Sequence, residues 1–273
     1  MKEGGGGSDL PEGGVDVRSY FARGRNALVV RGDFGDMYAA LILHKADHKL
    51  STPPDVGGML RDVLAAATLH AASRPHAETL AWTLGVTDPR ANLFVTVSNP
   101  ERTMTGTAFT EDLRQLDGGR FHAQVVVPGR EPRVSVTGFA GNNLFSAYEK
   151  HCADSEGRAV RLFRYAPEDI VLIAAQPDCD TGWLRSLDED AVRSLDSRAE
   201  LSLLERRVYR FACGCTHDRM REVLLPAMRA SPGELFGNEE AVTMRCPRCG
   251  ARYVVTKEAM EAAVAGAATP GGG

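Results

Sequence analysis

The sequence predicts an α+β protein in which an antiparallel sheet is packed with helices, followed by a helical linker and a small cysteine-organised C-terminal domain. Three observations predict this organisation. Apolar residues recur with helical spacing from residue 56 to 67, and apolar residues then alternate with a period of two from 79 to 139. Four of the six cysteines form two clusters near the C-terminus. The 273 residues exceed one typical domain and leave room for a small second unit.

The N-terminal third is expected to begin with a tail and continue mainly as helix. Gly-rich residues 1–14 have little to bury, which predicts a disordered tail. Residues 25–31 predict a strand, and residues 34–46 are dense in helix formers. Asp55 is expected to cap a core helix, and we expect His70 near its end to lie in a polar shell rather than bind metal. The apolar face of this helix comprises Val56, Met59, Leu60, Val63, Leu64 and Ala67.

The alternating stretch predicts an antiparallel sheet that the helices cover on one face. A short helix over 142–151 and a closing hairpin over 160–164 and 170–175 would complete a domain spanning residues 15–177. Residues 178–209 follow as the linker, with leucines at amphipathic spacing among Arg and Glu. These pieces could pack back onto the sheet or form a metastable linker.

The C-terminal domain is expected over residues 210–265. A helix over 218–230, interrupted near Pro226, would follow the first cysteine pair. Strands over 242–245 and 252–255 would carry the second pair, and a last helix would span 257–265. Residues 266–273 are expected to be a second disordered tail.

The two cysteine clusters predict a zinc site. Cys213 and Cys215 flank one glycine, so in an extended segment both side chains project to the same side. Cys246 and Cys249 are separated by two residues and followed by Gly250, which suits a tight turn. Four thiolates in a tetrahedron favour zinc. His217 would be superfluous as a ligand because four sulfurs complete the tetrahedron.

A zinc ion held in this way could be a structural staple or part of a switch. Most four-cysteine sites only stabilise a small ribbon. The Cys213-Gly-Cys215 pair is a less common spacing, and a disulfide across it would be strained and therefore easy to reduce. The isolated cysteines, Cys152 and Cys179, are expected to be small buried side chains.

These motifs resemble the C-terminal motif of the heat-shock protein 33 family, the redox-regulated holdase chaperones. The resemblance rests on CxC, a spacer of about thirty residues, CxxCG and the aromatic Tyr253, together with the flanking Phe211 and the arginines after Cys215. A Ser155-Glu156 dipeptide after a predicted aromatic helix is similar to the N-terminal domain of that family. The family's Gly-Asp-Gly-Pro turn is replaced by Gly-Val-Thr-Asp-Pro at 85–89, and the linker is shorter.

The resemblance implies a client-binding domain over 15–177 and a redox-switch domain over 210–265. The reduced, zinc-bound form would be inactive. Oxidation would pair Cys213 with Cys215 and Cys246 with Cys249, release zinc and unfold the C-terminal region. The surface thereby exposed would bind unfolding proteins and prevent their aggregation without ATP, and could join two oxidised chains as a homodimer.

Charge and motif content exclude other classes of function. A net charge of −4 and a C-terminal region with balanced charge argue against nucleic-acid binding. No apolar run suggests a membrane span or a signal peptide, so a cytoplasmic protein is expected, and the family resemblance implies a role in the stress response. We expect no enzymatic activity, because a four-cysteine site leaves no open position for a hydrolytic water. The alternative is a zinc-ribbon adaptor that binds a protein or nucleic acid in the reduced state.

Overall fold

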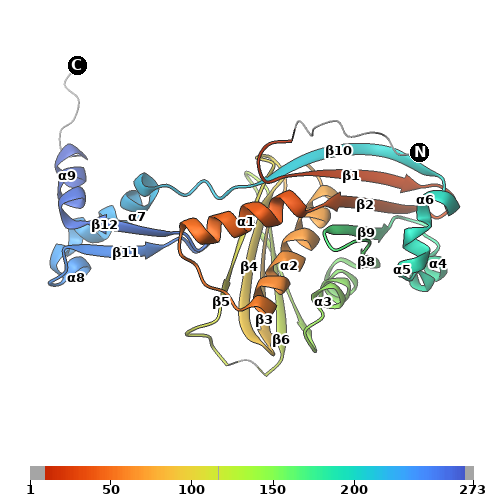
Figure 1. Cartoon of the computed structure of the whole chain (residues 1–273), viewed down its shortest axis with the longest axis horizontal. Helices are drawn as coiled ribbons and strands as arrows, with labels where there is room; N and C mark the ends of the chain where they lie inside the picture. The colour runs from red at the N-terminus through yellow and green to blue at the C-terminus, as the bar shows by residue number, and fades with distance from the viewer. Residues whose placement is uncertain (1–9, 116, 268–273) are drawn as a thin grey trace, which may run out of the picture.

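The computed structural model describes residues 10–115 and 117–267, which form one large and one small sheet with helices packed on them (Figure 1). The strands are β1 (Gly14–Ala22), β2 (Ala27–Asp33), β3 (Thr79–Thr87), β4 (Arg90–Ser98), β5 (Thr103–Phe109), β6 (Gly119–Val126), β7 (Arg133–Phe139), β8 (Val160–Arg164), β9 (Asp169–Ala175), β10 (Leu201–Phe211), β11 (Ala241–Arg245) and β12 (Arg252–Thr256). The helices are α1 (Gly35–Asp47), α2 (Pro54–Ala72), α3 (Leu144–His151), the π-helical η1 (Cys152–Glu156), α4 (Thr181–Ser186), α5 (Glu189–Arg193), α6 (Leu195–Arg198), α7 (His217–Ala230), α8 (Pro232–Phe236) and α9 (Lys257–Ala267). Within these described ranges, no helix has both the length and the apolar character needed to cross a membrane.

The large sheet consists of two antiparallel halves joined by a short parallel contact. Its strand order is β7-β6-β3-β4-β5-β10-β1-β2-β9-β8. Only Arg210 and Phe211 of β10 pair with β5, opposite Thr103 and Met104, and this pairing is parallel. All other neighbouring strands in the sheet run antiparallel, which confirms the predicted sheet type.

Helix α2 is the central core helix, as its spacing predicts. It contacts strands of both halves of the sheet, so it closes the core across the parallel joint. Leu60 and Leu64 are fully buried there. A second apolar cluster lies on the opposite face of β2 and β9. Adjacent strand residues point to opposite faces, so Val30 joins the main core and Val29 the second cluster.

The expected helical linker over 178–209 is only partly helical. Helices α4, α5 and α6 end at Arg198, and the chain then forms β10, which pairs with β1 along most of its length. The backbone hydrogen bonds that β1 offers outweigh the helical spacing of the leucines. We did not predict β1 or β10, because the ladder joins segments that lie about two hundred residues apart in the chain.

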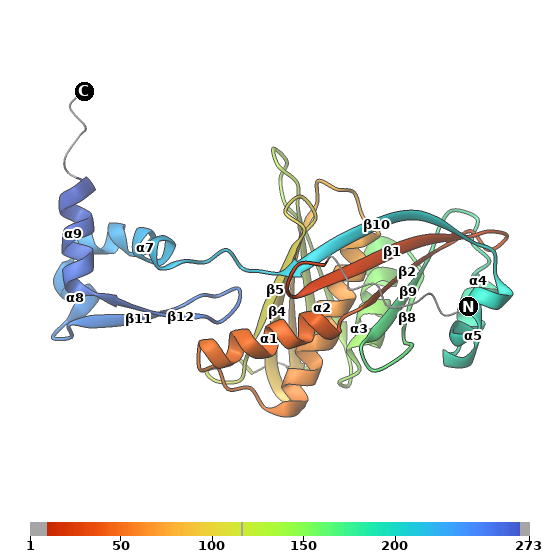
Figure 2. The same ribbon diagram turned by 45° about the horizontal axis from the view of Figure 1, so that its top comes forward.

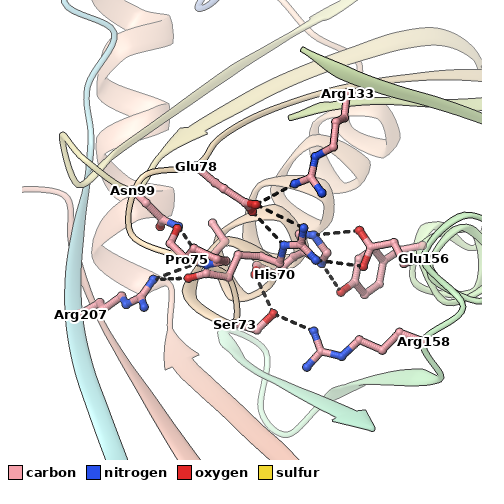
Figure 3. Close-up of polar contacts among 12 residues, drawn as sticks. His70, Ser73, Pro75, Glu78, Asn99, Arg133, Glu156, Arg158 and Arg207 are labelled. Atoms are coloured by element: carbon pink, nitrogen blue, oxygen red, sulfur yellow. Dashed lines mark hydrogen bonds and ion pairs between the residues drawn. The ribbon is translucent and has the colours of Figure 1, made fainter. Parts of the chain in front are cut away.

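Strand β10 is also fixed by polar side chains at the C-terminal end of α2 (Figure 3). The Arg207 guanidinium is buried and donates to the carbonyl oxygens of Ala71 and Arg74 at 3.3 and 3.0 Å. A cation is favourable at this end of a helix, where carbonyl groups lack partners. The Tyr209 hydroxyl donates to Asn99 Oδ1 at 2.5 Å. These contacts connect the strand before the cysteine pair to the core.

Several predictions about where helices and tails begin, break or end differ from the structure. Helix α2 begins at Pro54 after Pro53 as N-cap, so Asp55 lies inside the first turn and accepts a hydrogen bond from the Val56 amide. Helix α7 runs through Pro226 without interruption. Of the expected tails, residues 1–9 and 268–273 lie outside the described residues, Gly14 begins β1, and α9 extends to Ala267.

Stability should depend on pH through His151, a buried histidine of α3. Its ring stacks on Phe121, with centroids 4.3 Å apart, and its Nδ1 lies 2.9 Å from Thr137 Oγ1. Burial lowers the pKa of His151 to about 4, whereas an unfolded histidine titrates near 6.5. The unfolded chain therefore binds the extra proton first, and this stability is present above pH 6.5 and lost as the pH falls toward 4.

Replacing His151 with Gln should flatten this dependence. We expect the free energy of unfolding of the parent to fall by up to about 2 kcal/mol more than that of His151→Gln between pH 7 and pH 5, measured by urea titration. His122→Gln, at an exposed position of β6, should retain the parent's slope. Equal slopes for the parent and His151→Gln would contradict the assignment.

Candidate metal centre

The first cysteine pair lies in the extended segment between β10 and α7. Gly214 separates the two cysteines and has φ of +68°, a conformation that glycine adopts without strain. The Arg219 guanidinium donates to the Gly214 carbonyl oxygen at 2.9 Å, and the Thr216 side chain caps α7. Cys213 and Cys215 are thus held by a short extended segment that is anchored at the start of the helix.

The second cysteine pair lies in the turn between β11 and β12. The Cys246 amide donates to the Ala251 carbonyl oxygen at 2.8 Å, and the Gly250 amide donates to the Cys246 carbonyl oxygen at 2.9 Å. Gly250 has φ of +79°, so glycine is needed where the turn reverses. Cys246 and Cys249 are buried, whereas Cys213 and Cys215 are partly exposed.

The four sulfur atoms converge, as the spacing predicts. All lie within 4.8 Å of one another, and two of the separations are 3.6 Å from Cys213 to Cys246 and 3.4 Å from Cys215 to Cys249. A tetrahedral zinc ion with Zn–S bonds of about 2.3 Å needs sulfurs about 3.8 Å apart. The four-cysteine site therefore fits such an ion in number, element and spacing. His217 lies outside the cluster, with its ring centroid 5.1 Å from that of Tyr253.

Hydrogen bonds among the thiol groups shift the pKa values of two cysteines in opposite directions. The hydrogen bond from Cys249 is the main cause that lowers the pKa of Cys213 to about 5, and burial opposes it. The same hydrogen bond, together with burial, raises the pKa of Cys249. One thiolate near neutral pH is thus stabilised by neighbouring thiol donors, and Arg248 contributes to the same shift. Such a thiolate is a ready ligand for a soft cation.

Two polar side chains, Tyr253 and Arg248, contact the first cysteine pair. The Tyr253 hydroxyl lies 3.0 Å from both the Cys215 carbonyl oxygen and its Sγ. Arg248 donates to the Cys213 carbonyl oxygen at 3.3 Å. In the sequence Tyr253 is only the aromatic residue of the family resemblance, whereas its hydrogen bond to sulfur depends on the fold of the hairpin.

The C-terminal unit, residues 212–267, has a small apolar core. Two methionines of α7, Met260 of α9 and Phe236 of α8 pack with the cysteines. Figure 2 shows this unit beside the rest of the chain, connected by the extended segment before α7. A core of this size provides limited stability by itself, so a bound metal would add a large share.

The cysteine turn docks against the body of the protein, residues 14–211. His44 Nε2 of α1 lies 3.1 Å from the Cys249 carbonyl oxygen. Arg248 also donates to Thr96 Oγ1 at 3.3 Å, and the Arg245 guanidinium lies over the Phe109 ring at 4.6 Å. None of these body residues carries a sequence signal of its own, since only the fold brings them to the turn.

Gly250 fits the docked turn closely, which gives a test of the contact. A Cβ atom at this position would lie 2.6 Å from Thr107 Oγ1, and the left-handed backbone would be strained in addition. We expect Gly250→Ala to weaken docking and to raise amide hydrogen exchange of the turn and of the Thr96 and Thr107 strands. The free energy of unfolding should fall by about 1–3 kcal/mol.

Gly237→Ala serves as the control for Gly250→Ala. Gly237 also has positive φ and lies in the C-terminal unit, but a Cβ atom there meets no neighbour within 4 Å. It should strain the backbone and leave exchange in the body strands unchanged. Equal exchange in β4 and β5 for the two variants would contradict the docking contact.

Comparison with known protein families matches the region that contains the four clustered cysteines. A family model described as Hsp33 protein matches residues 170–256. A curated 33 kDa chaperonin from Caldanaerobacter subterraneus subsp. tengcongensis is 26% identical over 73 residues, which make up 27% of this chain and 25% of the relative. The sequence match thus spans only about a quarter of that relative's length.

The fold extends the likeness to almost the whole chain. The crystal structure of a 33 kDa chaperonin, a heat-shock protein 33 homologue from Thermotoga maritima, superimposes with a TM-score of 0.69. It covers 94% of this chain and 99% of the solved chain, at 13% sequence identity. At this identity the superposition establishes the fold. Together, the cysteine motif, the family model and the shared fold confirm the resemblance of this chain to the Hsp33 family.

Proposed function

We propose that this protein is a redox-regulated, ATP-independent holdase chaperone of the reducing cytoplasm, in which the four-cysteine site is the switch. The observation that carries the proposal is the convergence of four thiol groups in a unit whose own core is small. Zinc, when bound by the four thiolates, would add about 10–16 kcal/mol to the stability of such a unit. In this reduced form the protein would not bind clients.

Oxidation would remove the ligands. Each pair of thiolates would lose two electrons to one peroxide molecule, which takes up two protons from solvent, so that one disulfide and two waters form. We propose the pairs Cys213 with Cys215 and Cys246 with Cys249. Sulfur separations of 3.6 and 3.4 Å join other combinations, Cys213 with Cys246 and Cys215 with Cys249, so a tetrahedral cluster does not select the pairing by distance. Thiol mapping of the oxidised protein therefore has to identify the pairs.

The segment that oxidation would release is formed by α4, α5 and α6, here called the covering helices. They place Leu184, Leu187, Val192 and Leu195 on the second apolar cluster, over Phe163 and Ile173 of the sheet. Each helix has four to six residues, well below the length at which an isolated helix is stable in water. Their order thus depends on this packing.

The free energies explain why such a cover would be metastable. Burying four Leu or Val side chains contributes roughly 6–12 kcal/mol. Fixing the backbone of residues 181–198 costs a comparable or larger amount. Surface ion pairs such as Arg25 with Asp180 at 2.6 Å and Arg31 with Asp196 at 3.0 Å add little. A disturbance that reaches this segment through β10 could therefore release it.

Release would expose apolar surface without any catalytic turnover. The second apolar cluster on β2, β8 and β9, together with the leucines of the covering helices, would bind unfolding proteins. Two oxidised chains could also associate through the same surface as a homodimer. We propose no role in nucleic-acid binding, because holding unfolding proteins on an apolar surface requires no nucleic-acid partner.

The switch can be tested with peroxide. In reduced protein treated with hydrogen peroxide at mildly raised temperature, we expect release of about one zinc per chain and suppression of the aggregation of a thermally unfolding client, measured by light scattering. Cys246→Ser should retain zinc poorly and respond little to peroxide. Cys179→Ser, at a cysteine outside the cluster, should behave like the parent. Retention of zinc under peroxide would favour a static adaptor instead.

The covering helices can be tested without an oxidant. Leu184→Ala removes a side chain that is 1% exposed and should destabilise the cover by about 2–5 kcal/mol. We expect this variant to suppress client aggregation in reducing buffer, where the parent is inactive. Leu203→Ala, at a residue that is 60% exposed, should remain inactive. If Leu184→Ala stays inactive although proteolysis of residues 178–199 has increased, exposure of the apolar surface alone is insufficient for client binding.

A further inference from the structure

A second group of side chains that could bind a metal lies inside the body, two of them buried and one partly exposed. His70 lies near the C-terminal end of α2, and Cys152 and Glu156 lie four residues apart on the π-helical η1. Their ligand atoms lie within 4.8 Å of one another. His70 and Cys152 are 3% and 0% exposed, although we expected only a polar shell around His70. Short π-helical segments occur frequently at functional sites.

The histidine is oriented as metal ligands commonly are. Its Nδ1 lies 2.9 Å from the Tyr148 hydroxyl, and its Nε2 lies 3.5 Å from Glu156 Oε1, longer than a normal hydrogen bond (Figure 3). A ligating imidazole usually has its second nitrogen held by a hydrogen bond, which fixes the tautomer and the ring orientation. Tyr148 would hold Nδ1 here and leave Nε2 facing the carboxylate.

One oxygen atom of the Glu156 carboxylate has no hydrogen-bond partner in the described part of the chain. Glu156 Oε2 is buried without a hydrogen bond, and its nearest cation, Arg74 Nη1, lies 3.7 Å away. Arg74 is engaged instead by Glu78, at 2.9 Å. Arg158 donates to the Ala175 carbonyl oxygen at 3.0 Å and to Ser73 Oγ at 3.4 Å. These guanidinium groups surround the cluster and are occupied by other acceptors.

Protonation states of the three side chains are compatible with a cation between them. Burial lowers the pKa of His70 well below its ordinary value, so the imidazole is neutral and has a lone pair to offer. Burial raises the pKa of Cys152 to about 12, so its thiol loses the proton only when another cation takes its place. Metal binding would therefore release one proton, from Cys152.

We propose that His70 Nε2, Cys152 Sγ and the carboxylate of Glu156 bind a second divalent transition-metal ion. One nitrogen, one sulfur and one carboxylate oxygen form a ligand set that suits zinc, and cobalt as its spectroscopic substitute. Glu156 is partly exposed, which leaves room for a water molecule at the fourth position. The site is separate from the four-cysteine site and does not depend on the redox function proposed above.

Metal stoichiometry of the reduced full-length chain tests the site. After loading with zinc and removal of free metal, elemental analysis should find two ions per parent chain, one per Cys152→Ala chain and one per Glu156→Gln chain. Cys179→Ala should retain two. A chain with all four C-terminal cysteines changed to serine should retain one. One ion per parent chain and none in the four-serine chain would overturn the proposal and leave the four-cysteine site intact.

Cobalt identifies the ligands directly. In the four-serine chain, Co²⁺ should give a near-ultraviolet absorption band from a single sulfur ligand, and the band should disappear when Cys152→Ala is added. Glu156→Gln serves as the variant that keeps a polar side chain of the same size, and in metal-free buffer its far-UV circular dichroism and melting temperature should match those of the metal-free parent. A folded four-serine chain without the cobalt band would show a metal-free polar cluster and contradict the proposal.

Discussion

The convergence of four thiol groups is the constraint on which the rest of the C-terminal half depends. Two pairs that are separated by thirty residues meet within 4.8 Å because the segment between β10 and α7 presents one pair and the turn between β11 and β12 presents the other. The apolar core of this unit is small, and its cysteines form part of that core. If these cysteines bind a metal as proposed, a ligand set that also serves as core packing would couple the metal, the thiol state and the fold of the unit.

The coupling can reach the body along a continuous path. Strand β10 ends at Phe211, two residues before Cys213, and begins at Leu201, directly after the covering helices. It joins the two halves of the sheet through only two parallel residue pairs on the β5 side. Arg207 donates to the Ala71 carbonyl oxygen at the end of α2, and Tyr209 donates to Asn99, which itself donates to the same carbonyl oxygen. The strand is therefore well placed to connect the state of the cysteines with the segment that covers the second apolar cluster.

The sequence predicts some levels of this structure better than others. The cysteine site and the hairpins of the sheet depend on local spacing, so Cys246, Cys249 and strands such as β3 and β4 were predictable. Strand β10 was predicted as helix, because its pairing with β1 is a long-range contact without a local signal. The docking residues His44 and Thr96 were missed for the same reason. The burial of His70 beside Glu156 likewise appears only when α2 and η1 meet.

The central claim is that loss of the metal and oxidation of the cysteines loosen the covering helices while the core sheet stays folded. Amide hydrogen exchange, compared between the reduced zinc-loaded protein and the peroxide-oxidised protein, measures this directly. The account predicts that residues 181–198 and 212–267 lose protection after oxidation, whereas β3, β4 and α2 retain it. Unchanged protection of residues 181–198 in a fully oxidised, zinc-free chain would contradict the account.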